Sequence, residues 1–227
     1  MEKNIQKQQN IQVYPNKYLF RQENAETKER KIGLLLLCHN TSFNIHMDNT
    51  NLVEYILRQI EHEALISEVI IIHDLSTLSK IGDIIKTIQS TKVKRLYTKS
   101  VSLKDSISGA LGFTNGWDVV LLHESSRILM GNYMLNQALK AVEEYGSAFP
   151  IYNLSSIIEV QSPQVFKKTF FLDILAKNIP NITQISELYD IAKNSINIGT
   201  FKGSACNVKI LTQTDAYKVC ELLGKGV

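Results

Sequence analysis

The sequence has no apolar run long enough to cross a bilayer, since the longest one spans only Ile32 to Cys38. It also lacks the basic start and following apolar segment of an export signal, so we expect a cytoplasmic protein with no membrane contact. Cysteine is scarce, and Cys38, Cys206 and Cys220 show neither CxxC spacing nor an even count. They indicate neither a disulfide framework nor a thiolate metal site, and we expect them to be small core residues.

An excess of one charge is missing from most of the chain. The chain has 25 basic and 22 acidic residues, and residues 1 to 31 contain seven of the basic and four of the acidic ones. The remaining residues therefore include 18 of each and are formally neutral. Because a nucleic-acid-binding domain normally has a basic face, this balance argues against that class of partner. Residues 1 to 31 are rich in Gln, Asn, Lys and Glu and are predicted to form a polar extension. Its aromatic cluster, Tyr14 to Phe20, either docks on the body or on a partner, or belongs to a partly disordered tail.

Several catalytic motifs are also absent. The sequence contains no Gly-x-Ser-x-Gly, no Walker loop and no His-Glu-x-x-His, and its five histidines are not at metal-ligand spacing. With 44% hydrophobic and 21% charged residues, the composition is ordinary for a globular protein. No Pro- or Gly-rich linker interrupts residues 32 to 227, which we therefore predict to form a single α/β domain.

Short apolar runs alternate with segments of helical periodicity. The expected strands are Gly33–Leu37, Val69–His73, Val93–Thr98, Val119–Leu122, Ala148–Tyr152, Ile196–Phe201 and Asn207–Leu211. The expected helices are Asn51–His62, Ile81–Ile88, Ser102 to near Gly116, Asn132–Gly146, Phe170–Ala176, Ile185–Ala192 and Thr212–Leu223. Such alternation calls for right-handed crossovers, and it predicts an α/β fold with a Rossmann-like, mostly parallel sheet covered by helices on both faces.

The apolar run that begins at Val119 stops abruptly at His123 and Glu124, followed by two serines and Arg127. This pattern is typical of a buried parallel strand that delivers polar groups at its carboxyl end, where open α/β sheets bind ligands. A carboxylate there can hold a divalent cation against phosphate oxygens, and the guanidinium can clamp the same phosphates. A strand that ends in a solvated turn is the alternative, and the stretch by itself leaves both open.

Four motifs occur in an informative order: Lys104–Leu111, Leu122–Arg127, Gln161–Phe166 and Gly203–Ile210. Leu-His-Glu-Ser-Ser-Arg and Gln-Ser-Pro-Gln-Val-Phe resemble the Val-His-Asp-Ala-Ala-Arg and Gln-Thr-Pro-Gln-x-Phe of cytidylyltransferases that activate polyol phosphates. That family comprises the methylerythritol-phosphate cytidylyltransferases of isoprenoid biosynthesis and their ribitol-phosphate relatives. The resemblance covers Lys31 to Leu223 and implies a fold of the nucleotide-diphospho-sugar transferase type. It also implies attack of a polyol-phosphate oxygen on the α-phosphate of CTP, with Mg²⁺ present, to give a CDP-polyol and pyrophosphate.

The resemblance also implies roles for individual residues. Glu124 matches the family's metal-binding Asp, and Arg127 matches an Arg near the substrate phosphate. Lys209 falls on a phosphate-binding Lys, and Lys168 falls where the family has an Arg for the polyol phosphate. Ser106 corresponds to a hydroxyl that contacts cytosine. His39 and Asn40 lie in the loop that handles the nucleotide.

That same loop departs from the family pattern. The family has Ala-Ala-Gly-x-Gly-x-Arg, whereas Cys38 to Met47 contains neither Gly nor Arg, and its His39 and His46 are cations only when protonated. The Lys of the family's Pro-Lys-Gln has no counterpart, and most of the arm that pairs subunits is missing, which leaves the oligomeric state open. Losing one transition-state donor or cation typically costs about 10²- to 10³-fold in rate.

Two hypotheses therefore remain. The first is a cytidylyltransferase that uses CTP, Mg²⁺ and a polyol phosphate, with weak or altered activity. The second is a non-catalytic relative that acts as a binding or interaction protein.

Overall fold

The computed structural model describes residues 30–129, 131–154, 157–177, 181–194 and 198–224. Apart from Arg30 and Lys31, the predicted polar extension and its aromatic cluster lie outside the described residues. Lys31 is fixed to the body at two points. Its backbone N–H donates to Asp118 Oδ2 at 2.9 Å, and its Nζ lies 2.7 Å from Glu68 Oε1. The described part of the chain thus begins as a segment tied to the sheet.

The strands and helices follow the predicted alternation. The strands are β1 (Ile32–Leu37), β2 (His46–Met47), β3 (Thr50–Asn51), β4 (Glu68–His73), β5 (Val93–Thr98), β6 (Val119–Glu124), β7 (Ser147–Leu154), β8 (Ile157–Val160), β9 (Gln164–Lys167) and β10 (Gly199–Lys202). The α-helices are α1 (Leu52–His62), α2 (Leu78–Thr87), α3 (Leu103–Leu111), α4 (Asn132–Tyr145), α5 (Lys168–Ala176), α6 (Glu187–Lys193) and α7 (Gln213–Leu222). No helix among the described residues is both long enough and apolar enough to span a bilayer.

Local sequence signals explain where several helices begin and end. The Asn51 side chain accepts a hydrogen bond from the backbone N–H of Glu54, so α1 begins after it. Thr212 and Asp215 form a reciprocal capping box at the start of α7. Helix α4 ends at Gly146, whose φ of 79° is a left-handed conformation that glycine adopts without strain.

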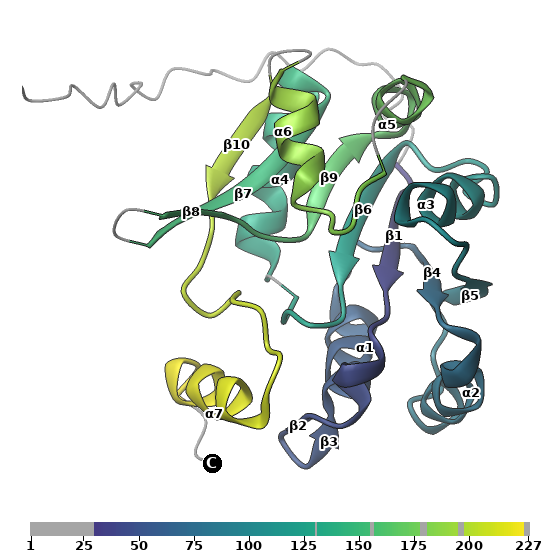
Figure 1. The fold of residues 1–227 in the computed structure, drawn as a ribbon, viewed down its shortest axis with the longest axis vertical. Coiled ribbons are helices and arrows are strands. Elements are labelled where there is room, and N and C mark those ends of the chain that lie inside the picture. Colours follow the sequence, from purple (N-terminus) through teal and green to yellow (C-terminus); the bar gives the residue numbers. More distant parts are fainter. Residues whose placement is uncertain (1–29, 130, 155–156, 178–180, 195–197, 225–227) are drawn as a thin grey trace, which may run out of the picture.

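The main sheet contains eight strands among the described residues, in the order β10-β7-β9-β6-β1-β4-β5, with β8 paired to β7 (Figure 1). Strand β1 runs parallel to both β4 and β6, and β5 runs parallel to β4. Strand β9 runs antiparallel to both of its neighbours, β6 and β7, and β8 runs antiparallel to β7. The predicted fold class, a mostly parallel sheet covered by helices, is confirmed.

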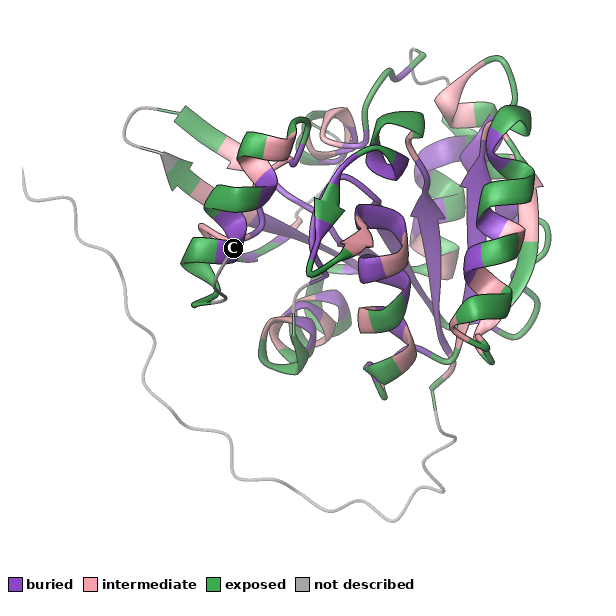
Figure 2. Ribbon diagram, turned by 90° about the horizontal axis from the view of Figure 1, so that it is seen from below, coloured by how far each residue is buried: buried purple, intermediate pink, exposed green. Residues whose placement is uncertain are grey.

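Two hydrophobic cores lie on opposite faces of this sheet, because side chains alternate along each strand. Leu34 and Leu36 of β1 belong to one core, which also contains the buried faces of α1, α2, α4 and α7. Leu35 and Leu37 belong to the other, together with α3, α5 and α6. Figure 2 shows the central strands buried and the outer faces of the helices exposed. The helices therefore cover both faces and leave the strand ends free to carry polar groups.

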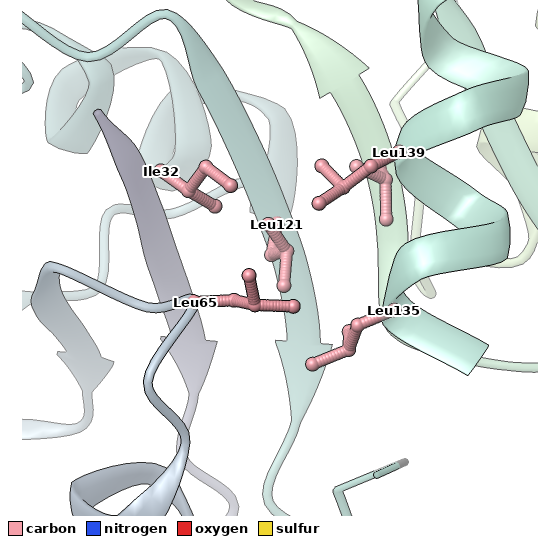
Figure 3. A pocket seen from close by; sticks show the side chains of 6 residues that line it. Ile32, Leu65, Leu121, Leu135 and Leu139 are labelled. Carbon is pink, nitrogen blue, oxygen red and sulfur yellow. The ribbon is translucent and has the colours of Figure 1, made fainter. Parts of the chain in front are cut away.

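The first of these cores is well filled between β6 and α4. Leu121 of β6, Leu135 and Leu139 of α4, and Leu65 after α1 converge with Ile32 of β1 (Figure 3). The space between these apolar side chains is too small for a water molecule. This region is packing that fixes α4 against the sheet, and it is not a ligand site.

Two features of the fold differ from the sequence prediction. The segment expected as a strand at Asn207–Leu211 is irregular, because its backbone bonds to the turn after β6: Ile210 N–H donates to Ser126 O at 2.7 Å. The short strands β8 and β9 were not predicted. Strand β9 begins within the Gln161–Phe166 motif, at Gln164, and runs antiparallel to β6, with Val119 opposite Lys167.

Candidate active site

The carboxyl ends of β1 and β6 lie side by side, with Leu37 paired to Glu124. The turn after β6 fastens them, because Ser125 N–H donates to Leu37 O at 2.8 Å. The backbone N–H of His39 in turn donates to Ser125 Oγ at 2.9 Å. Two residues 85 positions apart, His39 and Glu124, are therefore held at one edge of the sheet.

Glu124 is the electrostatic centre of this edge. Its carboxylate is almost fully buried, yet Oε1 lies 3.2 Å from Lys209 Nζ and 3.7 Å from His39 Nε2, and Oε2 lies 3.5 Å from Arg127 Nε. Burial by itself would raise the pKa of Glu124, but the nearby His39 ring and the charges of Lys209 and Arg127 lower it to about 2. The carboxylate is therefore ionised at physiological pH.

Lys209 reaches Glu124 because the loop after β10 is hydrogen-bonded to two neighbouring turns. Asn207 Nδ2 donates to Ser162 O at 2.6 Å, and the backbone N–H of Ile210 donates to Ser126 O at 2.7 Å. These two bonds lie on either side of Lys209 along the chain. The ammonium group is thus carried to the site by a segment that is hydrogen-bonded before and after it, through the Asn207 side chain and the Ile210 backbone.

Arg127 is buried within the same network. Its NH1 donates to the backbone oxygen of Asn207 at 2.5 Å and lies 2.8 Å from Glu159 Oε1. Its Nε has no hydrogen-bond partner among the described residues, since Glu124 Oε2 is 3.5 Å away. The guanidinium charge is therefore shared between two carboxylates.

His123 supports the turn that presents Glu124 and Arg127. Burial lowers its pKa to about 4, so the ring is neutral at physiological pH. Its Nε2 lies 3.0 Å from Arg127 O and its Nδ1 lies 2.9 Å from Ser162 Oγ. Because a carbonyl oxygen only accepts, Nε2 carries the hydrogen and Nδ1 accepts from the serine hydroxyl. His123 is therefore a hydrogen-bonded support within the turn.

A cavity of about 400 Å³ opens beside Glu124, which is within the range typical of small-molecule sites. It is lined at the strand ends and around the start of α3 by Leu37, His39, Asp74, Lys99, Ser100, Val101, Leu103, Ser106, Glu124, Thr183 and Gln184. Ser106 Oγ donates to Ser102 O at 2.8 Å and accepts from Ser100 N–H at 2.9 Å. One lone pair of this hydroxyl remains to accept a hydrogen bond from a ligand.

Four of the predicted site residues therefore converge on one point, and a fifth lines the same cavity. Glu124, Arg127, Lys209 and His39 form the charged group, and Ser106 lies on the cavity wall. Asn40 begins a single 3-10 turn (Asn40–Phe43), is exposed and is not among the lining residues.

The structure does not bring Lys168 to this group. Because β9 runs antiparallel to β6, it carries Lys168 away from Glu124 to the beginning of β6. There the Lys168 backbone N–H donates to Asp118 O at 3.0 Å, and Nζ donates to Thr114 O at 2.6 Å. Glu124 lies at the other end of the same strand.

Sequence reasoning missed three charged residues of the site. Asp74 and Lys99 directly follow β4 and β5, and Lys99 Nζ lies 3.5 Å from Asp74 Oδ2 at the cavity wall. Both could have been found by the strand-end argument that selected Glu124. Glu159 comes from β8, a strand that was not predicted, and no local signal marks it.

The loop after β1 packs inward in place of forming an open phosphate cradle. Ser42 and Phe43 are buried, and Ser125 Oγ donates to Ser42 Oγ at 3.1 Å. Lys80 of α2 lies over the Phe43 ring, with Nζ 5.6 Å from its centroid. The loop therefore offers the cavity His39 as its one charged or chargeable side chain among these residues.

The described residues contain no cluster of three or more His, Cys, Asp or Glu side chains arranged to hold a metal. Glu124 is nevertheless a buried, ionised carboxylate, and the nitrogen atoms of its neighbours Lys209, Arg127 and His39 all lie at 3.2 Å or more from it. Magnesium is commonly held by one or two carboxylates together with water and substrate phosphates. The site fits a Mg²⁺ ion that arrives with a phosphate ligand, and Glu124 would hold it.

Comparison with known sequences supports the resemblance drawn from the motifs. No family model matches the chain. The 2-C-methyl-D-erythritol 4-phosphate cytidylyltransferase of Clostridium tetani is 24% identical over 204 residues, covering 80% of this chain and 82% of that protein. The enzyme of the same name from Clostridium botulinum is 28% identical over 151 residues, covering 56% of this chain and 65% of that protein.

Solved structures show the same fold. The 4-diphosphocytidyl-2C-methyl-D-erythritol synthase of Anaerococcus prevotii superposes with a TM-score of 0.74 at 16% identity, covering 87% of this chain and all of that one. The 2-C-methyl-D-erythritol 4-phosphate cytidylyltransferase of Thermus thermophilus gives a TM-score of 0.66 at 15% identity, covering 85% of this chain and 98% of that one. In sequence and in fold, this chain resembles the 2-C-methyl-D-erythritol 4-phosphate cytidylyltransferase family.

Proposed function

We propose that this chain binds CTP in the cavity beside Glu124 and transfers CMP to a polyol phosphate, at a low rate. The observation that carries the proposal is the meeting of Glu124 and Lys209, 3.2 Å apart, at a cavity that is also lined by Ser106. The relatives named above act, by their names, on a methylerythritol phosphate. We propose that the acceptor of this chain is likewise methylerythritol phosphate or the similar ribitol phosphate. We also propose that residues 32–227 form one domain and that the protein acts in the cytoplasm.

In this proposal the base lies toward Ser106 and the phosphates lie toward Lys209. The free lone pair of Ser106 Oγ suits a donor such as the exocyclic amine of cytosine. Lys209 and a protonated His39 supply positive charge beside Glu124 for the phosphate oxygens. Two observations support this arrangement: Ser106, His39 and Glu124 line the same cavity, and Lys209 Nζ lies 3.2 Å from Glu124 Oε1.

The reaction requires no side-chain nucleophile. An oxygen of the acceptor phosphate bonds to the α-phosphorus of CTP, the bond from that phosphorus to the β-phosphate oxygen breaks, and pyrophosphate leaves. Catalysis of such transfers rests on positioning and on cations around the phosphorus. A Mg²⁺ ion held by Glu124 would offset charge on the phosphate oxygens. Lys209 holds the acceptor or leaving phosphate by charge and hydrogen bonds.

The low rate follows from the loop after β1. Its one chargeable side chain at the cavity is His39, in place of the permanent Arg expected from the family pattern. A missing transition-state donor or cation typically lowers the rate by about 10²- to 10³-fold. Glu124, Lys209 and Ser106 come from other elements, so in this proposal their part in binding does not depend on the Arg that the loop lacks.

The test is release of pyrophosphate from CTP, with Mg²⁺ and either methylerythritol phosphate or ribitol 5-phosphate. We expect slow release by the wild-type protein and none above background by Glu124→Gln. Glu144→Gln is a matched control, because Glu144 is an exposed residue near the end of α4. Binding of CTP without release from any acceptor would favour a non-catalytic binding protein instead.

A further inference from the structure

A carboxylate of the β7–β8 hairpin reaches into the candidate active site. Glu159 of β8 places Oε1 2.8 Å from Arg127 NH1, and Oε2 accepts a hydrogen bond from Gln161 Nε2 at 3.2 Å. Its side chain is 22% exposed, whereas that of Arg127 is 4% exposed. Glu159 is therefore the more exposed partner of this ion pair.

The hairpin is held in this position by a second set of contacts. Gln161 Nε2 also donates to Ser204 O at 2.9 Å, and Gln161 Oε1 accepts from Ser204 N–H at 3.0 Å. A Cβ atom on the neighbouring Gly203 would lie 2.5 Å from Gln161 Oε1, so this close approach requires glycine. Glu159 is thus fixed against the loop that carries Lys209.

Arg127 consequently has its charge matched within the protein. Glu159 and Glu124 flank the guanidinium at 2.8 and 3.5 Å, and Asn207 O accepts from NH1. A phosphate that is to be gripped by two guanidinium N–H groups must compete with these acceptors. Glu159 is the more exposed of the two carboxylates and belongs to a hairpin at the side of the sheet (Figure 1).

We propose that Glu159 sets the affinity of this site for anions by competing with ligand phosphate for Arg127. Binding of a phosphate group to Arg127 displaces the Glu159 carboxylate, and part of the binding free energy is used in that exchange. The inference rests on the proposed function only in that the ligand carries phosphate. It adds a residue to the site that the sequence motifs do not mark.

Substitution of Glu159 by Gln removes the competing charge and keeps the shape of the side chain. The neutral amide oxygen still accepts a hydrogen bond from Arg127, whereas the amide nitrogen that replaces Oε2 cannot accept from Gln161 Nε2. The two hydrogen bonds between Gln161 and Ser204 remain to hold the hairpin. When a binding group is free for only a fraction of the time, apparent affinity falls by that fraction. We therefore expect Glu159→Gln to bind an anion about tenfold more tightly than the wild-type protein.

The experiment is calorimetric titration with inorganic pyrophosphate, without metal and without CTP. Glu144→Gln controls for the change in net charge, and Glu159→Asp keeps the charge on a shorter side chain. We expect Glu159→Gln to bind pyrophosphate more tightly than the wild-type protein, and Glu144→Gln to bind it equally. Glu159→Asp should have an affinity between those of the wild-type protein and Glu159→Gln. Thermal denaturation of each variant verifies that it is folded.

Two outcomes overturn the inference. One is equal or weaker pyrophosphate binding by folded Glu159→Gln, and the other is equal tightening by Glu144→Gln, which would assign the effect to net charge. If Glu159→Gln does not fold, Glu159→Asp gives the test, and unchanged binding by that variant counts against the inference. Because no turnover is measured, absence of cytidylyl transfer would refute the proposed function and leave this result standing.

Discussion

Lys209 Nζ lies 3.2 Å from Glu124 Oε1, although the two residues come from an irregular loop after β10 and from the end of β6. The contact depends on two hydrogen bonds that flank Lys209, one from the Asn207 side-chain amide and one from the Ile210 backbone N–H. A buried carboxylate with a lysine at this distance is arranged for a ligand that brings both phosphate and a metal ion.

Replacement of Lys209 by Met should weaken pyrophosphate and CTP binding, because it removes the most exposed permanent cation beside Glu124. We expect a loss of roughly tenfold or more, typical of a charge-assisted hydrogen bond to phosphate. Lys168→Met is the matched control, since the structure places Lys168 beside Thr114 at the far end of β6. Calorimetry of both variants measures the effect, and equal losses from the two would refute the assignment.

Glu124 should make protein stability depend on pH in the acid range. Its pKa is lowered from 4.5 to about 2 in the folded protein, so its stabilising contribution is present above about pH 4.5 and is lost as the pH falls toward 2. This lowering of the pKa corresponds to a contribution on the order of 3 kcal/mol to the free energy of unfolding.

Urea midpoints between pH 6 and pH 3 measure that contribution. We expect the midpoint to fall less steeply for Glu124→Gln than for the wild-type protein, while Glu144→Gln follows the wild type. Parallel curves for Glu124→Gln and wild type would show that the neighbouring cations do not favour the ionised carboxylate.

A permanent cation in place of His39 should raise the rate of transfer. His39 Nε2 lies 3.7 Å from Glu124 Oε1, and the imidazole is a cation only when protonated. We expect His39→Lys to release pyrophosphate about tenfold faster or more, because the lysine ammonium is a cation without depending on the state of an imidazole. His46→Lys is the control, because His46 is in β2 and lines a different cavity. No gain from His39→Lys would mean that the slow step is not limited by missing charge.

Gly203→Ala should both destabilise the protein and weaken anion binding. The new Cβ would lie 2.5 Å from Gln161 Oε1 and 3.1 Å from Tyr152 Cβ, so the loop carrying Lys209 must shift. We expect a loss of about 1–3 kcal/mol in the free energy of unfolding.

Gly82→Ala is the matched control for that substitution. Gly82 lies within α2, and nothing lies within 4 Å of the position its Cβ would occupy. Because alanine favours helix over glycine, we expect a gain of about 0.5–1 kcal/mol. Chemical denaturation measures both variants, and a Gly203→Ala protein as stable as the wild type would contradict the close packing at Gln161.

Much of the fold is predictable because the apolar periods of the sequence match the elements. Leu34 to Leu37 alternate between the two cores, and the spacing of Leu52, Ile56 and Ile60 faces α1 inward. The ends of parallel strands share one edge, so Glu124 and the loop containing His39 could be placed together from the sequence. Resemblance to the family added Ser106 and Lys209.

The remaining features depend on contacts that the sequence pattern does not encode. Because β9 runs antiparallel to β6, Lys168 lies near the beginning of β6 and Glu124 at its end. No local sequence pattern distinguishes an antiparallel strand of four residues from a loop. Glu159 enters the site only because β8 folds back on β7. These two differences therefore lie in short antiparallel strands, where long-range pairing decides the structure.

The most direct test of the central claim is calorimetric titration of the full chain with CTP in the presence and absence of Mg²⁺. The account predicts one CTP per chain, with tighter binding in Mg²⁺ for the wild-type protein and for Glu144→Gln. Glu124→Gln should lose the Mg²⁺ dependence, because the carboxylate that would hold the ion is gone. Failure of the wild-type protein to bind CTP, or an unchanged Mg²⁺ effect in folded Glu124→Gln, would contradict the account.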